Sequence, residues 1–114
     1  MSITDPPPVT VPMRKEAERA RRIRAADAMV ARMRDYASRE GGRFVVFGSF
    51  VTGRMGHDSD LDVMIDFPDA GRRAAWDFLE NLSAEHGLAL DPFDQATTKP
   101  AFAARVEATG LHLP

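Results

Sequence analysis

The stretch that decides the fold is residues 44–67, FVVFGSFVTGRMGHDSDLDVMIDF. Its first four residues form a continuous apolar run between Gly41-Gly42 and Gly48-Ser49, which indicates a short, fully buried strand rather than a helix. A glycine at the end of such a strand lets the backbone approach a ligand closely. Because Ser49 can start a short helical turn, its hydroxyl and the nearby backbone N–H groups are expected to face an anion such as a phosphate. This segment therefore predicts half of a nucleotide site.

The second half of the stretch, residues 60–67, alternates between apolar and mostly acidic side chains. Since successive side chains of a strand point to opposite faces, the apolar residues are expected in the core and the acidic residues on the other face. Asp60 and Asp62 would repel each other there unless a cation neutralised them, and carboxylate oxygens suit Mg²⁺ or Mn²⁺. A metal at this place would carry nucleotide phosphates, which Gly48 and Ser49 would hold from the other side.

Gly48-Ser49, a spacer of ten residues and Asp60-x-Asp62 resemble the signature of the DNA polymerase β-like nucleotidyltransferase superfamily. The short chain looks most similar to the minimal nucleotidyltransferases (MNT) of that superfamily, and the resemblance covers about residues 43–95. A lone Gly-Ser or a lone Asp-x-Asp is common. Both motifs at this separation, each on an expected apolar strand, form a specific combination.

In that superfamily, a third carboxylate on a neighbouring strand completes the metal site and helps to activate the attacking hydroxyl. Asp91 matches it, because alternation in the expected strand 88–94 places Asp91 on a face that can join the other two carboxylates. Pro92 cannot donate to a strand ladder and favours an edge strand or an early strand end, which leaves Asp94 as the substitute. A turn-forming Asp-Pro is the alternative without a functional role. In the loop, Arg54 is the residue best placed to meet a phosphate, against the alternative of a plain surface arginine.

Composition bounds the remaining possibilities. The chain of 114 residues, 44% of them hydrophobic, is expected to form one small domain with a single core. A net charge of −2 argues against direct nucleic-acid binding by bulk electrostatics. The absence of cysteine excludes disulfide and thiolate chemistry. Since there is no long apolar run and no apolar signal core at the N-terminus, we expect a cytoplasmic protein without a membrane segment.

The other elements are expected to support the site. The prolines near the N-terminus predict a disordered Pro-rich tail. The apolar spacing that follows predicts one domain, residues 13–114. The expected segments are the tail 1–12, an amphipathic helix 13–39, a helix 71–86, a short helix 99–109 and a C-terminal tail 111–114. The predicted class is α/β (α+β), the polymerase β-like nucleotidyltransferase fold. It has a small mixed β-sheet of three or more strands, with helices on one face and the acidic site at the other.

The resemblance implies a Mg²⁺-dependent transfer of a nucleoside monophosphate, here expected to be AMP from ATP, to a hydroxyl acceptor. In this interpretation the nucleotide is bound by Gly48, Ser49 and Arg54, and the metal by Asp60, Asp62 and Asp91. Since the chain ends soon after the third expected strand, the acceptor site is expected from a partner or a second copy. The family analogy implies a HEPN-domain toxin as that partner, with this chain as its antitoxin. Two alternatives stay open: a non-catalytic binding module that neutralises its partner by contact, and a small-molecule nucleotidyltransferase that acts as a homodimer.

Overall fold

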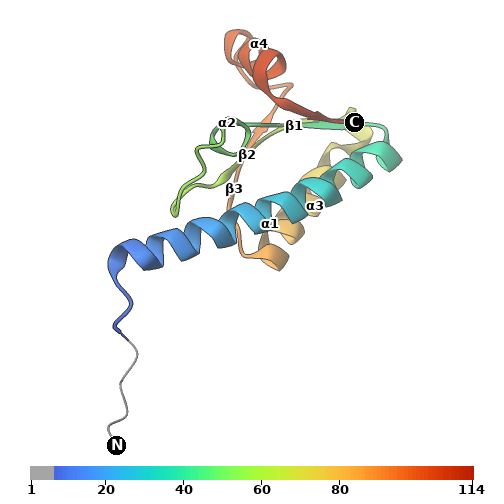
Figure 1. Ribbon diagram of the computed structural model, residues 1–114. Coiled ribbons are helices and arrows are strands. Elements are labelled where there is room, and N and C mark those ends of the chain that lie inside the picture. The colour runs from blue at the N-terminus through green and yellow to red at the C-terminus, as the bar shows by residue number, and fades with distance from the viewer. Residues whose placement is uncertain (1–6) are drawn as a thin grey trace, which may run out of the picture.

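The computed structural model describes residues 7–114 and arranges them as a sheet with helices on both of its sides (Figure 1). In chain order the elements are α1 (Val11–Glu40), β1 (Arg43–Phe47), α2 (Ser49–Thr52), β2 (Leu61–Asp66), α3 (Asp69–His86), β3 (Leu90–Asp94), α4 (Pro100–Thr109) and β4 (Leu111–Leu113). Each element that the sequence predicts is present, with ends that move by at most two residues.

The sheet is four-stranded and mixed, in the order β3-β2-β1-β4. β1 pairs antiparallel with β2 and with β4, whereas β2 and β3 are parallel. The parallel pair needs a crossover connection, and α3 supplies it. β3 is an edge strand, as Pro92 predicts. Proline has no N–H to donate, and at an edge strand this removes no hydrogen bond if the position faces away from the neighbouring strand. The predicted class, α/β (α+β) with a small mixed β-sheet of three or more strands, is confirmed.

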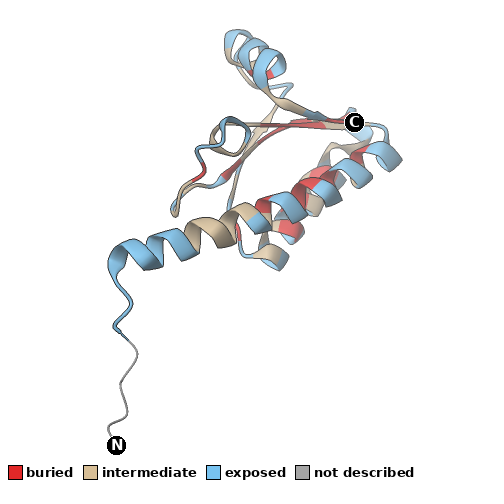
Figure 2. Ribbon diagram, in the orientation of Figure 1, coloured by how far each residue is buried: buried red, intermediate tan, exposed pale blue. Residues whose placement is uncertain are grey.

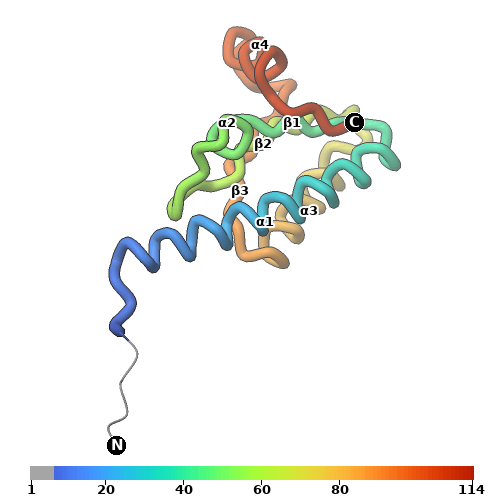
Figure 3. Tube along the Cα trace, in the orientation of Figure 1, coloured from blue at the N-terminus to red at the C-terminus, as the bar shows by residue number. Residues whose placement is uncertain are grey.

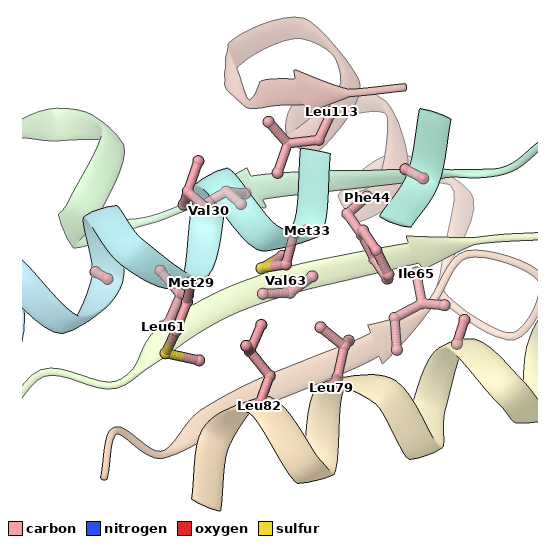
Figure 4. Packing of buried hydrophobic residues seen from close by; sticks show 14 of the residues in the cluster. Met29, Val30, Met33, Phe44, Leu61, Val63, Ile65, Leu79, Leu82 and Leu113 are labelled. Atoms are coloured by element: carbon pink, nitrogen blue, oxygen red, sulfur yellow. The ribbon is translucent and has the colours of Figure 1, made fainter. Parts of the chain in front are cut away.

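α1 and α3 cover one face of the sheet and enclose the main core (Figure 2). Figure 4 shows side chains from both helices meeting those of the strands in this layer. Alternate side chains of β2 point into this core: Leu61, Val63 and Ile65 are all 0–1% exposed. Full burial of a side chain of this size stabilises the fold by about 1.5–3 kcal/mol, so this layer is the main source of stability.

α4 packs on the opposite face, which differs from the expectation that all helices lie on one side. Val106 of α4 joins Val45 and Met64 in a second, smaller buried cluster. Phe102 packs against this cluster together with Phe93 of β3. α4 lies there because the second face of β1 and β2 carries these apolar side chains, which need a cover.

The C-terminal residues 111–114, predicted as a tail, instead contain strand β4, which pairs with β1. Leu111 and Leu113 face the main core, and Leu113 is fully buried. Gly110 lets the chain turn from α4 into this strand, since a Cβ there would overlap Cγ1 of Val45. A strand of three residues has too little alternation to be recognised from sequence, and its pairing with β1 is a long-range contact.

α1 begins earlier than predicted and extends past the sheet (Figure 3). Thr10 is its N-cap and accepts a hydrogen bond from the N–H of Met13 at 3.2 Å. Val11 and Pro12, placed in the tail by the sequence, form its first turn, where proline is tolerated because its missing N–H has no helical partner. Residues 7–10 are exposed, and residues 1–6 of the predicted tail lie outside the described residues. No helix within residues 7–114 is both long and apolar enough to cross a membrane.

Candidate active site

Gly48 turns the chain from the end of β1 into the short helix α2. Its dihedral angles are φ 76° and ψ −147°, a region that residues with a Cβ rarely adopt. The Gly48 carbonyl accepts hydrogen bonds from the N–H groups of Val51 and Thr52, both at 3.1 Å. These bonds close the predicted helical turn, which begins at Ser49.

Strand pairing brings the predicted carboxylates to one edge of the site. Asp62 on β2 lies opposite Phe47 on β1 and is paired with Asp91 on β3. Since paired residues of parallel strands point to the same face, the side chains of Asp62 and Asp91 are neighbours. Asp60 directly precedes β2, and its charge acts on Asp62. The structure therefore brings together the three acidic residues that the sequence singled out.

The Gly-Ser and Asp-x-Asp motifs are in direct contact. A Cβ atom on Gly48 would overlap Oδ2 of Asp62, so only glycine leaves room for that carboxylate. The glycine turn and the acidic strand are thus adjacent in the structure, as the spacing of the motifs predicts.

Asp62 is the least exposed of the three carboxylates, and its surroundings favour the protonated form. The pKa of Asp62 is raised to about 6, and burial of the carboxyl group is the main cause. The negative charges of Asp91 and Asp60 and a hydrogen bond with Asp91 raise it further. Because these charges add to the effect of burial, this carboxylate is neutralised more readily than an isolated one.

The donor set fits a divalent metal that is shared with a nucleotide. Within residues 7–114, no group of three His, Cys, Asp or Glu side chains is already arranged to hold a metal ion. Asp60 is paired instead with Arg22, whose Nη1 lies 3.7 Å from Oδ1 of Asp60. Mg²⁺ is commonly held by one or two carboxylates plus substrate phosphates rather than by a complete protein cage. Asp62 and Asp91, side by side, supply ligands of that kind.

Comparison with known proteins decides the family. The family model described as a nucleotidyltransferase domain matches residues 29–100, which is more than half of the chain. The chain belongs to this nucleotidyltransferase domain family. Neither the curated proteins nor the solved structures give a match. The matched range contains all the residues that the sequence assigned to the site, so the family supports nucleotidyl transfer as the general activity of this fold and site.

In this nucleotidyltransferase domain, the structure shows whether Asp91 or Asp94 lies next to Asp62. Asp91 lies within β3 rather than in an Asp-Pro turn. Asp94 pairs with Ile65, on the alternate set of β3 positions. Its Oδ2 lies 3.4 Å from Nε of Arg72, and its Oδ1 accepts a hydrogen bond from the N–H of Ala96 at 2.9 Å. Asp94 therefore stabilises the segment after β3 and is not part of the acidic row.

Arg54 follows α2 and is tied to the site through its backbone. Its N–H donates a hydrogen bond to the carbonyl of Ser49 at 2.8 Å, and its side chain is exposed. This position leaves the guanidinium free to turn toward a ligand next to Ser49. Binding of a phosphate by Arg54 stays a prediction.

Arg22 is a residue near the site that the sequence did not single out. Besides Asp60, it contacts the carbonyl of Ser59, to which its Nη1 donates a hydrogen bond at 2.7 Å. In the sequence, Arg22 is one of several basic residues on a helix with i,i+4 acidic partners, which is the pattern of a solvated face. Nothing local in that pattern shows that one arginine reaches a loop 37 residues further along the chain.

Proposed function

We propose that this chain is a Mg²⁺-dependent nucleotidyltransferase that moves AMP from ATP to a hydroxyl acceptor. The observation that supports this most directly is the pairing of Asp62 with Asp91, next to a glycine turn that has no room for a side chain. The family supplies the reaction class, and the crowded carboxylates supply the chemistry for a metal-nucleotide complex.

The proposed reaction gives each residue a separate task. Gly48 and Ser49 bind the β- and γ-phosphates through backbone N–H groups and the serine hydroxyl, with Arg54 as an additional phosphate ligand. Asp60, Asp62 and Asp91 would hold the metal, which would supply positive charge to offset the negative charge that develops on the leaving group. The acceptor oxygen bonds to the α-phosphorus, the bond from that phosphorus to the β-phosphate oxygen breaks, and pyrophosphate leaves.

Asp91 is the group proposed to receive the proton of the acceptor hydroxyl. It is exposed and lies on an edge strand, so an acceptor can approach it from outside the sheet. A carboxylate within hydrogen-bond reach of the hydroxyl lowers the barrier by removing the proton as the oxygen attacks. Asp62, which is less exposed, keeps its place in the metal site.

For the acceptor we propose a partner protein, and by family resemblance a HEPN-domain toxin for which this chain is the antitoxin. The exposed carboxylates Asp60 and Asp91 support a large acceptor, because they leave the site open on the solvent side. This arrangement suits a hydroxyl that another protein presents.

Labelled nucleotide transfer tests the proposal. The chain is incubated with α-phosphate-labelled ATP and Mg²⁺ in a lysate of its host, and the products are separated on a denaturing gel. We expect a labelled protein band with the wild type and none with Asp60→Asn/Asp62→Asn. Asp35→Asn, which changes an exposed carboxylate on α1, is the matched control and is expected to label normally. Equal labelling by the double variant would show that these carboxylates do not carry the reaction. If the wild type neutralises its partner but labels no protein, the non-catalytic binding module is favoured instead.

A further inference from the structure

Glu18 on α1 is held between two arginines of the same helix. Its carboxylate accepts hydrogen bonds from Arg21 at 2.8 and 3.0 Å and from Arg22 at 2.9 Å. These contacts, with Arg21 first, lower the pKa of Glu18 to about 2. Glu18 therefore stays charged at neutral pH and fixes the direction of both guanidinium groups.

The two arginines reach different segments of the chain. Arg22 donates to the carbonyl of Ser59 at 2.7 Å, and Arg21 donates to the carbonyl of Gly87 at 3.1 Å. Ser59 lies in the segment that enters β2, and Gly87 is the C-cap of α3 in the segment that enters β3. The Glu18 carboxylate thus orients two arginines, each of which contacts a backbone carbonyl far from α1 in sequence.

Both segments lead directly to the acidic residues of the site. Asp60 follows Ser59, and Asp91 is the second residue of β3. The entries of the two parallel strands are also joined to each other, because the N–H of Leu61 donates to the carbonyl of Ala89 at 3.0 Å. A shift of either segment therefore moves a carboxylate relative to the other.

We propose that Glu18, Arg21 and Arg22 form a clamp that positions the carboxylates of β2 and β3 for the metal-nucleotide complex. The role in nucleotide binding rests on the proposed function, whereas the hold on the two segments does not. The clamp residues are positioning residues, since they act through the backbone of Ser59 and Gly87.

The distances indicate that Arg22 acts by holding the backbone more than by its charge. Its bonds to Ser59 and Glu18 have hydrogen-bond lengths, but its Nη1 lies 3.7 Å from the carboxylate of Asp60. The Asp60 side chain is 49% exposed, and ion pairs of such exposure contribute little. Loss of Arg22 should therefore loosen the entry of β2 more than it frees Asp60 for a cation.

Amide hydrogen exchange of the metal-free protein tests the clamp without any assay of activity. We expect Arg22→Ala to speed exchange at Leu61 at least fivefold, and Arg21→Ala to do so at Leu88, whose N–H bonds to the carbonyl of Ser83. Arg19→Ala is the matched control, because Arg19 is on the same helix and pairs with the exposed Glu16. Exchange in Arg22→Ala and Arg21→Ala equal to that in Arg19→Ala would overturn the proposal.

Binding of Mn²⁺ in the presence of ATP, followed by water proton relaxation, tests the link to the site. We expect the Kd of the Mn²⁺-ATP complex to rise about tenfold in Arg22→Ala and to stay raised in Arg22→Lys, which keeps the charge but not the two-sided contact. Tighter binding in Arg22→Ala, or full rescue by lysine, would overturn the clamp as a positioning device. If the wild type binds no Mn²⁺-ATP, the proposed function fails, and the exchange rates still decide whether the clamp exists.

Discussion

At Gly48 the site depends on the absence of a side chain. The positive φ and the contact with Oδ2 of Asp62 both exclude a Cβ. We expect Gly48→Ala to abolish nucleotidyl transfer, because the new methyl group displaces either the turn or the Asp62 carboxylate. Backbone strain alone is expected to cost about 1–3 kcal/mol of stability, measured by urea unfolding.

Gly53→Ala is the control for this substitution. Gly53 has a similar φ of 73°, but nothing lies within 4 Å of the place where its Cβ would be. Its alanine variant should lose about 1 kcal/mol from the left-handed backbone and keep most of its transfer activity. Equal loss of activity in both variants would contradict the role given to the contact with Asp62.

Asp62 should make the stability of the metal-free protein depend on pH. Its pKa is raised from 3.8 to about 6 in the folded protein, so the folded state binds the proton more tightly than the unfolded chain does. The stabilisation is complete below the unfolded pKa and is lost as the pH rises through about 6. At neutral pH, Asp62→Asn should therefore be more stable than the wild type by about 1 kcal/mol, a value reduced for solvent screening.

Urea unfolding at a series of pH values measures this effect. The difference between Asp62→Asn and the wild type should shrink as the pH falls below about 6, since the wild-type carboxyl is then protonated as well. Asp35→Asn should follow the wild type throughout. A difference that does not change with pH would contradict the raised pKa of Asp62.

Among individual residues, the sequence predicts the acidic and glycine residues of the candidate site better than the residues that hold them in position. Gly48, Asp60 and Asp62 follow from local patterns, because a strand that ends in Gly-Ser and a strand that alternates with aspartate are each visible within a few residues. The choice of Asp91 over Asp94 needs the register of β3 against β2. The contact of Arg22 with Ser59 depends on how α1 crosses the sheet, which no local pattern contains.

At the level of elements, Arg43 joins β1 to β2, α4 and β4. Its guanidinium donates to Asp66 at 2.6 Å and to Glu107 at 2.8 Å, and it contacts Nδ1 of His112 at 3.1 Å. These partners raise the pKa of Arg43, with Glu107 as the main cause, so it stays charged. Arg43→Met should lower the free energy of unfolding by about 1–2 kcal/mol, because three elements lose a shared partner.

The matched control for that prediction is Arg32→Met. Arg32 links α1 to α3 through a single pair with Glu85 at 3.3 Å, and both side chains are more than half exposed. This pair should contribute less than about 0.5 kcal/mol. Equal unfolding free energies for the two variants would show that the Arg43 contacts do not hold the C-terminal elements to the sheet.

The accuracy of the predicted elements follows their length and regularity. α1 and α3 have long apolar stripes and glycine C-caps, and β1 and β2 are short runs between turn residues, so their positions follow from the sequence. β4 was missed because three residues carry almost no pattern and its partner, β1, is far away in the chain. For the same reason the sequence did not predict that α4 would cover the second face of the sheet.

In the molecule as a whole, the two faces of the sheet have different tasks. α1 and α3 bury one face completely enough to fix the strands, while α4 covers only part of the other and leaves the carboxylates at the edge accessible. The buried side chains of β2 therefore hold in place the strand that carries Asp62. A packed sheet with an accessible acidic edge suits the metal-nucleotide complex and the external acceptor of the proposed function.

The most direct test of the central claim is whether Asp62 and Asp91 together bind the metal-nucleotide complex. Binding of Mn²⁺ with ATP to the purified chain, measured by water proton relaxation, gives the Kd for the wild type, Asp62→Asn, Asp91→Asn and Asp35→Asn. The account predicts that each of the two site variants weakens binding at least tenfold and that Asp35→Asn binds like the wild type. Unchanged binding in both site variants would contradict the assignment of this acidic row as the active site.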